Sequence, residues 1–279
     1  MKKSTLLIGL LLYCSTAFSQ DNTFGFGKET YANDRGQILL VPWENKMYIS
    51  DINKEVSNRT NLSIDEIKRL FREGFCQIFA QNAAENWDVI DLVTSGEEGH
   101  LRDLERIHRS ISYRYENVPP TEEPAKAKRL LMKLKPKTSE GQEANGGEIK
   151  NGEIYTYYDE KERYMNTQIN NPELMSYLAD QYEFEYIVFL NELDIRVLRD
   201  HNQERGQTWD RQVKVHYTVC DIEGKSVCSS AAYGVYKGEM KDIYEIIRKN
   251  FPNPCKVICN DLNTTLAKQT SETGVDEDY

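Results

Sequence analysis

The sequence predicts one mixed α/β domain with a long, partly disordered insertion and a disordered acidic C-terminal tail. Three observations lead to this fold class. Short apolar runs alternate with longer segments of helical period in the first part of the chain, which indicates a partly parallel sheet covered by helices in two or three layers. Three consecutive strand-like runs follow further on, as in an antiparallel meander. Between these parts lies a stretch rich in Pro, Gly, Lys and Glu that predicts no packed element.

The chain begins with a pattern typical of a secretory signal peptide, residues 1–19. Lys2 and Lys3 precede an apolar run at 6–12, and Ala17-Phe18-Ser19 is a cleavage motif of small residues. No other segment reaches the length of a membrane-spanning helix. We therefore expect a bacterial protein exported through its signal peptide, either periplasmic, associated with the outer envelope, or secreted.

An N-terminal extension, 20–36, leads into the first part of the domain, 37–116. The predicted elements are a strand at 38–43, a polar loop at 45–61, a helix at 63–86, a strand at 87–93 and a helix at about 99–115. Pro42 ends the apolar run of the first strand. Ser63 and Glu66 form a capping box at the start of the first helix, because each side chain can bind the backbone N–H of the other residue.

The insertion is expected at 117–153, the second part of the domain at 154–260 and the disordered tail at 261–279. The predicted elements are a helix beginning at Asn171-Pro172, a strand at 186–197, a polar loop at 198–210, strands at 213–219 and 226–235, and a last short helix at 242–250. Along 213–219, apolar residues alternate with polar ones, as in a half-buried strand. Gly224 lies where the turn between the last two strands favours positive φ.

Three stretches resemble the α/β domain shared by the amino-terminal part of TolB, the outer-membrane activators of penicillin-binding proteins and the curli secretion lipoprotein. They are Ile38–Asn45, with its Pro-Trp ending, the step from Leu178–Tyr182 into the strand at 186–190, and Tyr217–Lys225, with its Asp and turn Gly. The resemblance covers 38–93 and 172–251. It implies an envelope protein that binds other proteins and has no enzymatic activity. These motifs indicate a fold, and one fold can serve several functions.

Trp43, Asn45 and Tyr48 form the first candidate binding group. They follow the first strand, and ligands of open α/β sheets gather at the carboxyl ends of parallel strands. Exposed aromatic residues also anchor protein interfaces. The alternative is that Trp43 caps the core above the first helix, with its ring on Phe71 and Phe75.

Asn191 is the second candidate. Strand alternation places it on an apolar face with Ile187, Phe189, Leu193 and Ile195, so its buried amide needs a hydrogen-bond partner. Either it fastens a loop or neighbouring strand, or it contacts a ligand. Glu192 and Asp194 would alternate on the opposite face.

No metal site or cofactor is expected. His100 and His108 lie on roughly one face of a predicted helix and lack further ligands nearby in the sequence. Cys220 and Cys228 flank the Gly224 turn. Simple pairing would place them on one face but diagonally, which is long for a disulfide, so we expect no bond between them unless the turn register differs. A bridge from one of them to Cys255 or Cys259 stays open.

These observations leave three hypotheses for the function. The first is a non-enzymatic protein-binding module in envelope assembly, trafficking or regulation, with envelope proteins of unknown identity as partners. The second is a periplasmic or secreted hydrolase with an acidic site at Glu192, Asp194 and the loop 198–210. The third is an oligomerising structural subunit, a homo-oligomer formed through a sheet edge. The acidic balance, a formal net charge of -10, argues against nucleic-acid binding.

Overall fold

The computed structural model describes residues 35–117, 147–150, 153–156, 163–198 and 208–273. The chain divides into two compact units. The first, Met1–Asp34, lies outside the described residues, and the second, Arg35–Tyr279, is described by itself.

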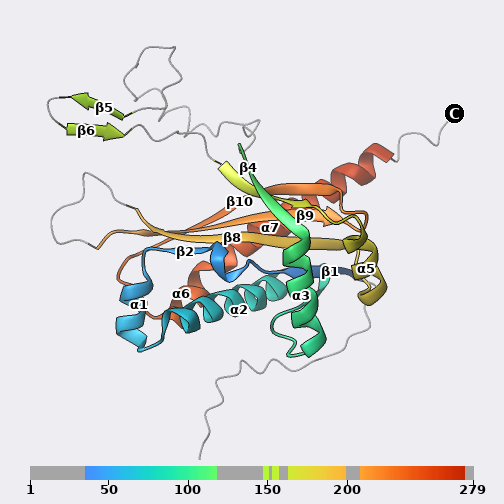
Figure 1. Cartoon of the computed structure of the whole chain (residues 1–279), viewed down its shortest axis with the longest axis horizontal. Coiled ribbons are helices and arrows are strands. Elements are labelled where there is room, and N and C mark those ends of the chain that lie inside the picture. Colours follow the sequence, from blue (N-terminus) through green and yellow to red (C-terminus); the bar gives the residue numbers. More distant parts are fainter. Residues whose placement is uncertain (1–34, 118–146, 151–152, 157–162, 199–207, 274–279) are drawn as a thin grey trace, which may run out of the picture. The chain divides into compact units, whose positions relative to one another are not determined.

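The main sheet is mixed, as the sequence predicts (Figure 1). Its strand order is β10-β9-β8-β1-β3, with β2 also paired to β8. The strands are β1 (Gly36–Val41), β2 (Tyr48–Ser50), β3 (Trp87–Asp91), β8 (Tyr186–Val197), β9 (Arg211–Asp221) and β10 (Ser226–Tyr236). β1 runs parallel to β3 and β8, whereas β8, β9 and β10 form the predicted antiparallel meander.

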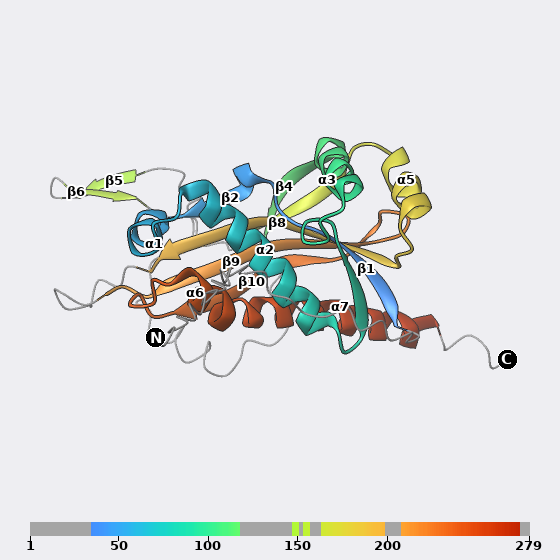
Figure 2. The ribbon, with the colours of Figure 1, turned by 90° about the horizontal axis from the view of Figure 1, so that it is seen from below.

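One face of the sheet packs against three helices, α2 (Ile64–Ala83), α6 (Ile243–Asn250) and α7 (Pro252–Thr273) (Figure 2). The short helix α1 (Asn53–Thr60) packs against α2. Alternate strand residues such as Ile38 and Leu40 enter this core, while their neighbours Leu39 and Val41 face the other side. That second face is covered by α3 (Glu98–Ser110) and α5 (Glu173–Gln181). Since both faces of β1 are buried, its sequence reads as a continuous apolar run.

Several local predictions are confirmed. The capping box begins α2, with Ser63 Oγ accepting from Glu66 N at 3.3 Å and the Glu66 carboxylate accepting from Ser63 N at 2.8 Å. β8 has the predicted bounds, and Gly224 has a φ of +81° in the turn between β9 and β10. Pro42 ends β1, after which a 3-10 helix, η1 (Asn45–Met47), returns the chain to β8 as β2.

The predicted loop at 45–61 is wrong, because β2 and α1 form within it. The helix predicted to run to about residue 115 ends at Ser110, and β4 (Ile111–Asn117) follows directly. β4 pairs antiparallel with β7 (Arg163–Ile169), which lies in a stretch assigned no regular element. Strand β4 was missed because Ile111 continues the helical spacing of the preceding residues.

β5 (Gly147–Lys150) lies in the predicted insertion and β6 (Glu153–Thr156) begins at its last residue, and the two form a two-stranded antiparallel pair. Residues 118–146, which contain the lysine-rich stretch, lie outside the described residues.

The predicted tail at 261–279 is also wrong in its first part, because α7 continues to Thr273 and residues 274–279 lie outside the described residues. Phe251, Cys255, Ile258 and Leu262 are all buried, and their spacing is helical. Pro252 and Pro254 obscured this pattern, although proline is tolerated in the first turn of a helix.

None of the helices in the described part of the chain is long and apolar enough to cross a membrane.

Candidate functional site

We call the β4–β7 pair the ribbon. A buried polar layer lies between the ribbon and strands β8 and β9. The interlayer polar cluster consists of the side chains of Tyr115, Thr167, Asn191, Glu192, Asp194, His216 and Thr218. All of these except Tyr115 are buried. The ribbon runs at a steep angle to the sheet strands beside it (Figure 1). The alternation in β9 therefore does not produce the half-buried strand that was expected, because the ribbon covers its polar side.

A β-bulge brings the cluster together. The pairing of β8 with β9 shifts between Leu190 and Glu192, which leaves Asn191 as the extra residue. A bulge reverses the side of the residues that follow it. Leu193 consequently faces the helices α2, α6 and α7, and Asn191 and Glu192 both face the ribbon. The prediction is therefore wrong for the residues after the bulge: Leu193 and Ile195 lie on the opposite face from Asn191, and Glu192 lies on the same face.

Asn191 fastens the ribbon to the sheet. Its Nδ2 donates to the Met165 carbonyl at 2.6 Å and to Thr218 Oγ1 at 2.9 Å. Its Oδ1 accepts from Thr167 Oγ1 at 2.6 Å. The expected hydrogen-bond partner of the buried amide is thus found, and it is the neighbouring strand β7. These contacts match the alternative in which Asn191 fastens a strand. That Asn191 contacts a ligand stays a prediction.

His216 and Thr218 complete this attachment. The backbone N–H of Met165 donates to His216 Nδ1 at 2.6 Å, and that of Thr167 donates to Thr218 Oγ1 at 3.0 Å. Because Nδ1 accepts, the neutral imidazole carries its proton on Nε2, which lies 3.4 Å from Glu192 Oε1. Burial, together with the nearby charges of Lys214 and Arg196, lowers the pKa of His216 to about 3.

Glu192 and Asp194 are both buried, and Glu192 lies beside this histidine. Tyr115 donates to Glu192 Oε2 at 3.0 Å, and Arg196 binds Asp194 Oδ2 at 2.5 Å. Burial raises the pKa of both carboxyl groups. Asp194 Oδ1 is buried without a hydrogen-bond partner among the described residues. Both acids are therefore buried, and neither lies on a solvated face. The hydrolase hypothesis stays a prediction.

The two edges of the ribbon differ. Met165 and Thr167 direct their N–H groups into the sheet, so in an antiparallel ladder their opposite residues, Tyr115 and Tyr113, direct their N–H and C=O groups away from β7. No described residue hydrogen-bonds these outward backbone groups of Tyr113 and Tyr115. Among the described residues, the outer edge of β4 is therefore unpaired, and we call it the open edge, while β7 is held by side chains in place of a third strand.

The first candidate group does not form one site. The Trp43 ring is buried and packs edge-on against Phe75, with centroids 5.6 Å apart. Tyr48 is buried, stacks on Phe71 and donates to Asn53 Oδ1. These contacts place the Trp43 ring in the core, as in the capping alternative.

Asn45 is exposed and accepts from Arg72, and Asn191 lies on the opposite face of the sheet from Trp43. The structure thus separates the four candidate residues. Their roles in binding stay predictions.

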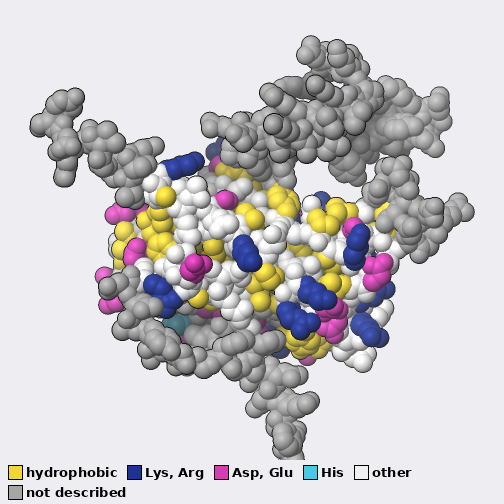
Figure 3. Space-filling model, turned by 180° about the vertical axis from the view of Figure 1, so that it is seen from behind, with side chains coloured by type: hydrophobic (Ala, Val, Ile, Leu, Met, Phe, Trp, Pro, Cys, Tyr) yellow, Lys and Arg dark blue, Asp and Glu magenta, His cyan; other side chains and the backbone are white. Residues whose placement is uncertain are grey.

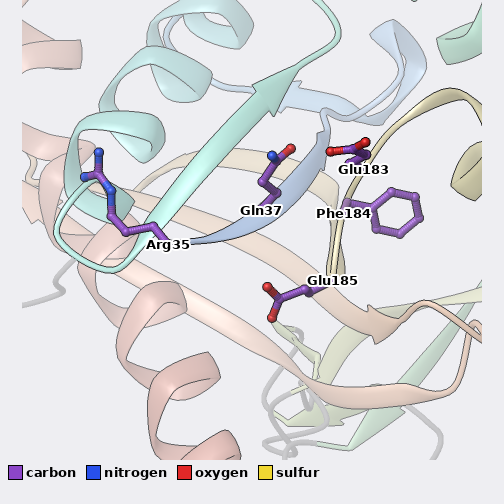
Figure 4. A pocket seen from close by; sticks show the side chains of 5 residues that line it. All are labelled: Arg35, Gln37, Glu183, Phe184 and Glu185. Atoms are coloured by element: carbon purple, nitrogen blue, oxygen red, sulfur yellow. The ribbon is translucent and has the colours of Figure 1, made fainter. Parts of the chain in front are cut away.

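A shallow pocket lies at the amino end of β1, opposite the end where the sequence predicts ligands. Its lining residues are Arg35, Gln37, Glu183, Phe184 and Glu185. Figure 4 shows the Gln37 side chain between Arg35 and Glu183, with the Phe184 ring turned away from Arg35. Arg35 is already paired with Asp88 at 3.2 Å and donates to the Ala84 carbonyl. The pocket therefore offers mainly the carboxylates of two exposed residues, Glu183 and Glu185.

Cys220 and Cys228 are not bonded to each other, as predicted, although the reason differs. A register shift between Ser226 and Cys228 pairs Cys228 with Val219. Cys220 faces the α3–α5 side, whereas Cys228 packs against the core on the α2–α7 side. Within the described residues, no group of three or more His, Cys, Asp or Glu side chains could hold a metal ion.

Sequence reasoning missed Tyr115, Thr167, His216 and Thr218 as cluster members. The signal that could have found three of them is polar side chains on strands. His216 and Thr218 alternate with Val215, Tyr217 and Val219, and Thr167 lies two residues after Met165. No protein-family model matches the chain, and a comparison with curated proteins finds no match.

Proposed function

We propose that this chain is an exported, non-enzymatic protein-binding module of the bacterial envelope that binds partners by adding a strand to β4. The module would act in the assembly, trafficking or regulation of envelope complexes. The export signal at 1–19 and the resemblance to the TolB-type domain support this setting, and the open edge of β4 carries the proposal.

Two properties of β4 favour strand addition. Its outward backbone groups, at Tyr113 and Tyr115, have no partner among the described residues. Main-chain hydrogen bonds to such an edge provide affinity for an extended segment. The edge is also firmly supported, because β7 is held to the sheet through Asn191, His216 and Thr218. A fixed edge lowers the entropic cost of binding.

The rest of the described surface favours a local binding edge over a broad apolar interface. On the face in Figure 3, hydrophobic side chains are interspersed with Lys, Arg, Asp and Glu. The exposed large hydrophobic residues are contributed by different elements, for example Leu101 from α3, Tyr115 from β4 and Val235 from β10. Tyr115 is the one of these three that lies on the open edge.

Site-specific photocrosslinking in cells that export the chain tests the proposal. A benzophenone side chain replaces Arg114, which is exposed on β4, and in a matched control replaces Glu105, which is exposed on α3. We expect discrete adducts from position 114 and none of the same mass from position 105. The absence of discrete adducts at 114, or identical adducts at both positions, would refute strand addition at β4.

A hydrolase is the second candidate, favoured by the buried acid pair beside His216. The general acid of such an enzyme needs a raised carboxyl pKa, and burial provides this for Glu192. Chromogenic ester, phosphate and glycoside substrates test it. An activity that Glu192→Gln abolishes and Glu105→Gln preserves would support the hydrolase, and no turnover of any substrate class would reject it.

A further inference from the structure

We propose that a second copy of this chain binds the edge of β4, with the two β4 strands antiparallel and Tyr115 opposite Tyr115. This inference rests on the proposed strand addition and names its partner. The two ribbons would join into one four-stranded sheet in the order β7-β4-β4-β7, around a twofold axis at Tyr115.

The direction of the backbone groups limits the registers. Only Tyr113, Tyr115 and the residues in phase with them direct their N–H and C=O groups outward. An antiparallel pair that uses these groups must therefore place odd-numbered residues opposite odd-numbered ones. With Tyr115 at the centre, Tyr113 faces Asn117 of the second copy, and all outward groups of these residues find partners.

Charge selects this register. Arg114 and Glu116 then lie directly opposite each other, twice, by symmetry. Opposite charges at directly facing positions stabilise an antiparallel pair, and like charges destabilise it. A shift that centres the pair on Arg114 would place two arginines face to face. A shift that centres it on Tyr113 would place Arg114 opposite Ser112, without a charge partner.

The Glu116 carboxylate is held in a position where it can bind an arginine side chain. Tyr164 Oη donates to its Oε2 at 2.8 Å, and Asn166 Nδ2 donates to its Oε1 at 3.1 Å. These two bonds lower the pKa of Glu116, so it is a carboxylate at neutral pH. They also fix the carboxylate on the ribbon face that carries Arg114, since 114 and 116 have the same phase along the strand. Each oxygen has further acceptor sites for a guanidinium group.

Charge reversal combined with sedimentation equilibrium tests the pairing. The chain purified after export should show a concentration-dependent dimer. Arg114→Glu and Glu116→Arg should each raise the dissociation constant about tenfold or more, because each turns two attractive pairs into two repulsive ones. Arg109→Glu, the same charge change at an exposed position of α3, should leave the dimer unchanged.

Two experiments that restore the charge pairs distinguish a lost contact from a misfolded variant. An equimolar mixture of Arg114→Glu with Glu116→Arg should form a heterodimer, since each glutamate then faces an arginine. The double variant should dimerise with itself as the natural chain does. A monomeric natural chain, unaffected single variants or a mixture that does not associate would overturn the inference. If adducts to a different protein still form at position 114, the failure concerns the partner and leaves strand addition standing.

Discussion

Replacing Asn191 by Ala should strongly destabilise the fold, because the amide makes three hydrogen bonds in a fully buried position. The substitution leaves the Met165 carbonyl and the Thr167 hydroxyl without partners. An unpaired buried polar group costs about 1–3 kcal/mol, so two such groups cost roughly 2–6 kcal/mol. We expect about 3 kcal/mol, because Thr218 keeps its bonds to the Thr167 N–H and the Asn166 side chain.

Urea unfolding followed by circular dichroism measures this loss as a lower midpoint at an unchanged slope. For a domain of this size, about 3 kcal/mol corresponds to a decrease in melting temperature of roughly 6–12 °C. Asn170→Ala is the matched control, since Asn170 is exposed and makes one side-chain bond, to Ser112 at 3.1 Å. Its effect should stay within about 0.5 kcal/mol. Equal effects of the two substitutions would refute the fastening role of Asn191.

Three further predictions concern other parts of the fold. Burial raises the pKa values of Glu192 and Asp194, so their contribution to stability is present at acidic pH and is lost as the pH rises through the folded-state values. Glu192→Gln should therefore gain stability relative to the natural chain between pH 4 and pH 7 in urea titrations, and a constant difference would contradict this. Gly224→Ala should cost about 1–3 kcal/mol in the same assay, because φ is +81° and the added Cβ would lie 3.0 Å from two side chains. Leu262→Ala should cost about 2–5 kcal/mol and Leu101→Ala less than about 0.5, since only the first is buried, and equal losses would show that α7 does not pack as described.

The sheet could be predicted because its strands carry their own signals. β8 is long and rich in β-branched and aromatic residues, and β9 and β10 flank the turn at Gly224. The helix α2 was fixed by its capping box and apolar period. These are local properties of the sequence, and the packing in the folded chain leaves these elements as the local sequence predicts.

The candidate site could not be predicted because it depends on long-range packing. The bulge at Asn191 changes which residues face the ribbon, and no local pattern in β8 marks it. Strand β7, which supplies the partners of Asn191, begins at Arg163, 28 residues earlier in the chain. Its sequence does not predict a strand. Only the fold brings Met165 and Thr167 onto His216 and Thr218. The sequence suggested that Asn191 needs a partner, but it could not identify the strand that supplies it.

Amide hydrogen exchange, resolved to single residues within the ribbon, tests the central claim that β7 is fastened and β4 is open. In dilute solution, the amides of Met165 and Thr167 should be strongly protected, because His216 and Thr218 accept from them. The amides of Tyr113 and Tyr115 should exchange rapidly and become protected as the concentration rises and the edge is occupied. Equal protection of all four amides in dilute solution, or unprotected Met165 and Thr167, would contradict the account.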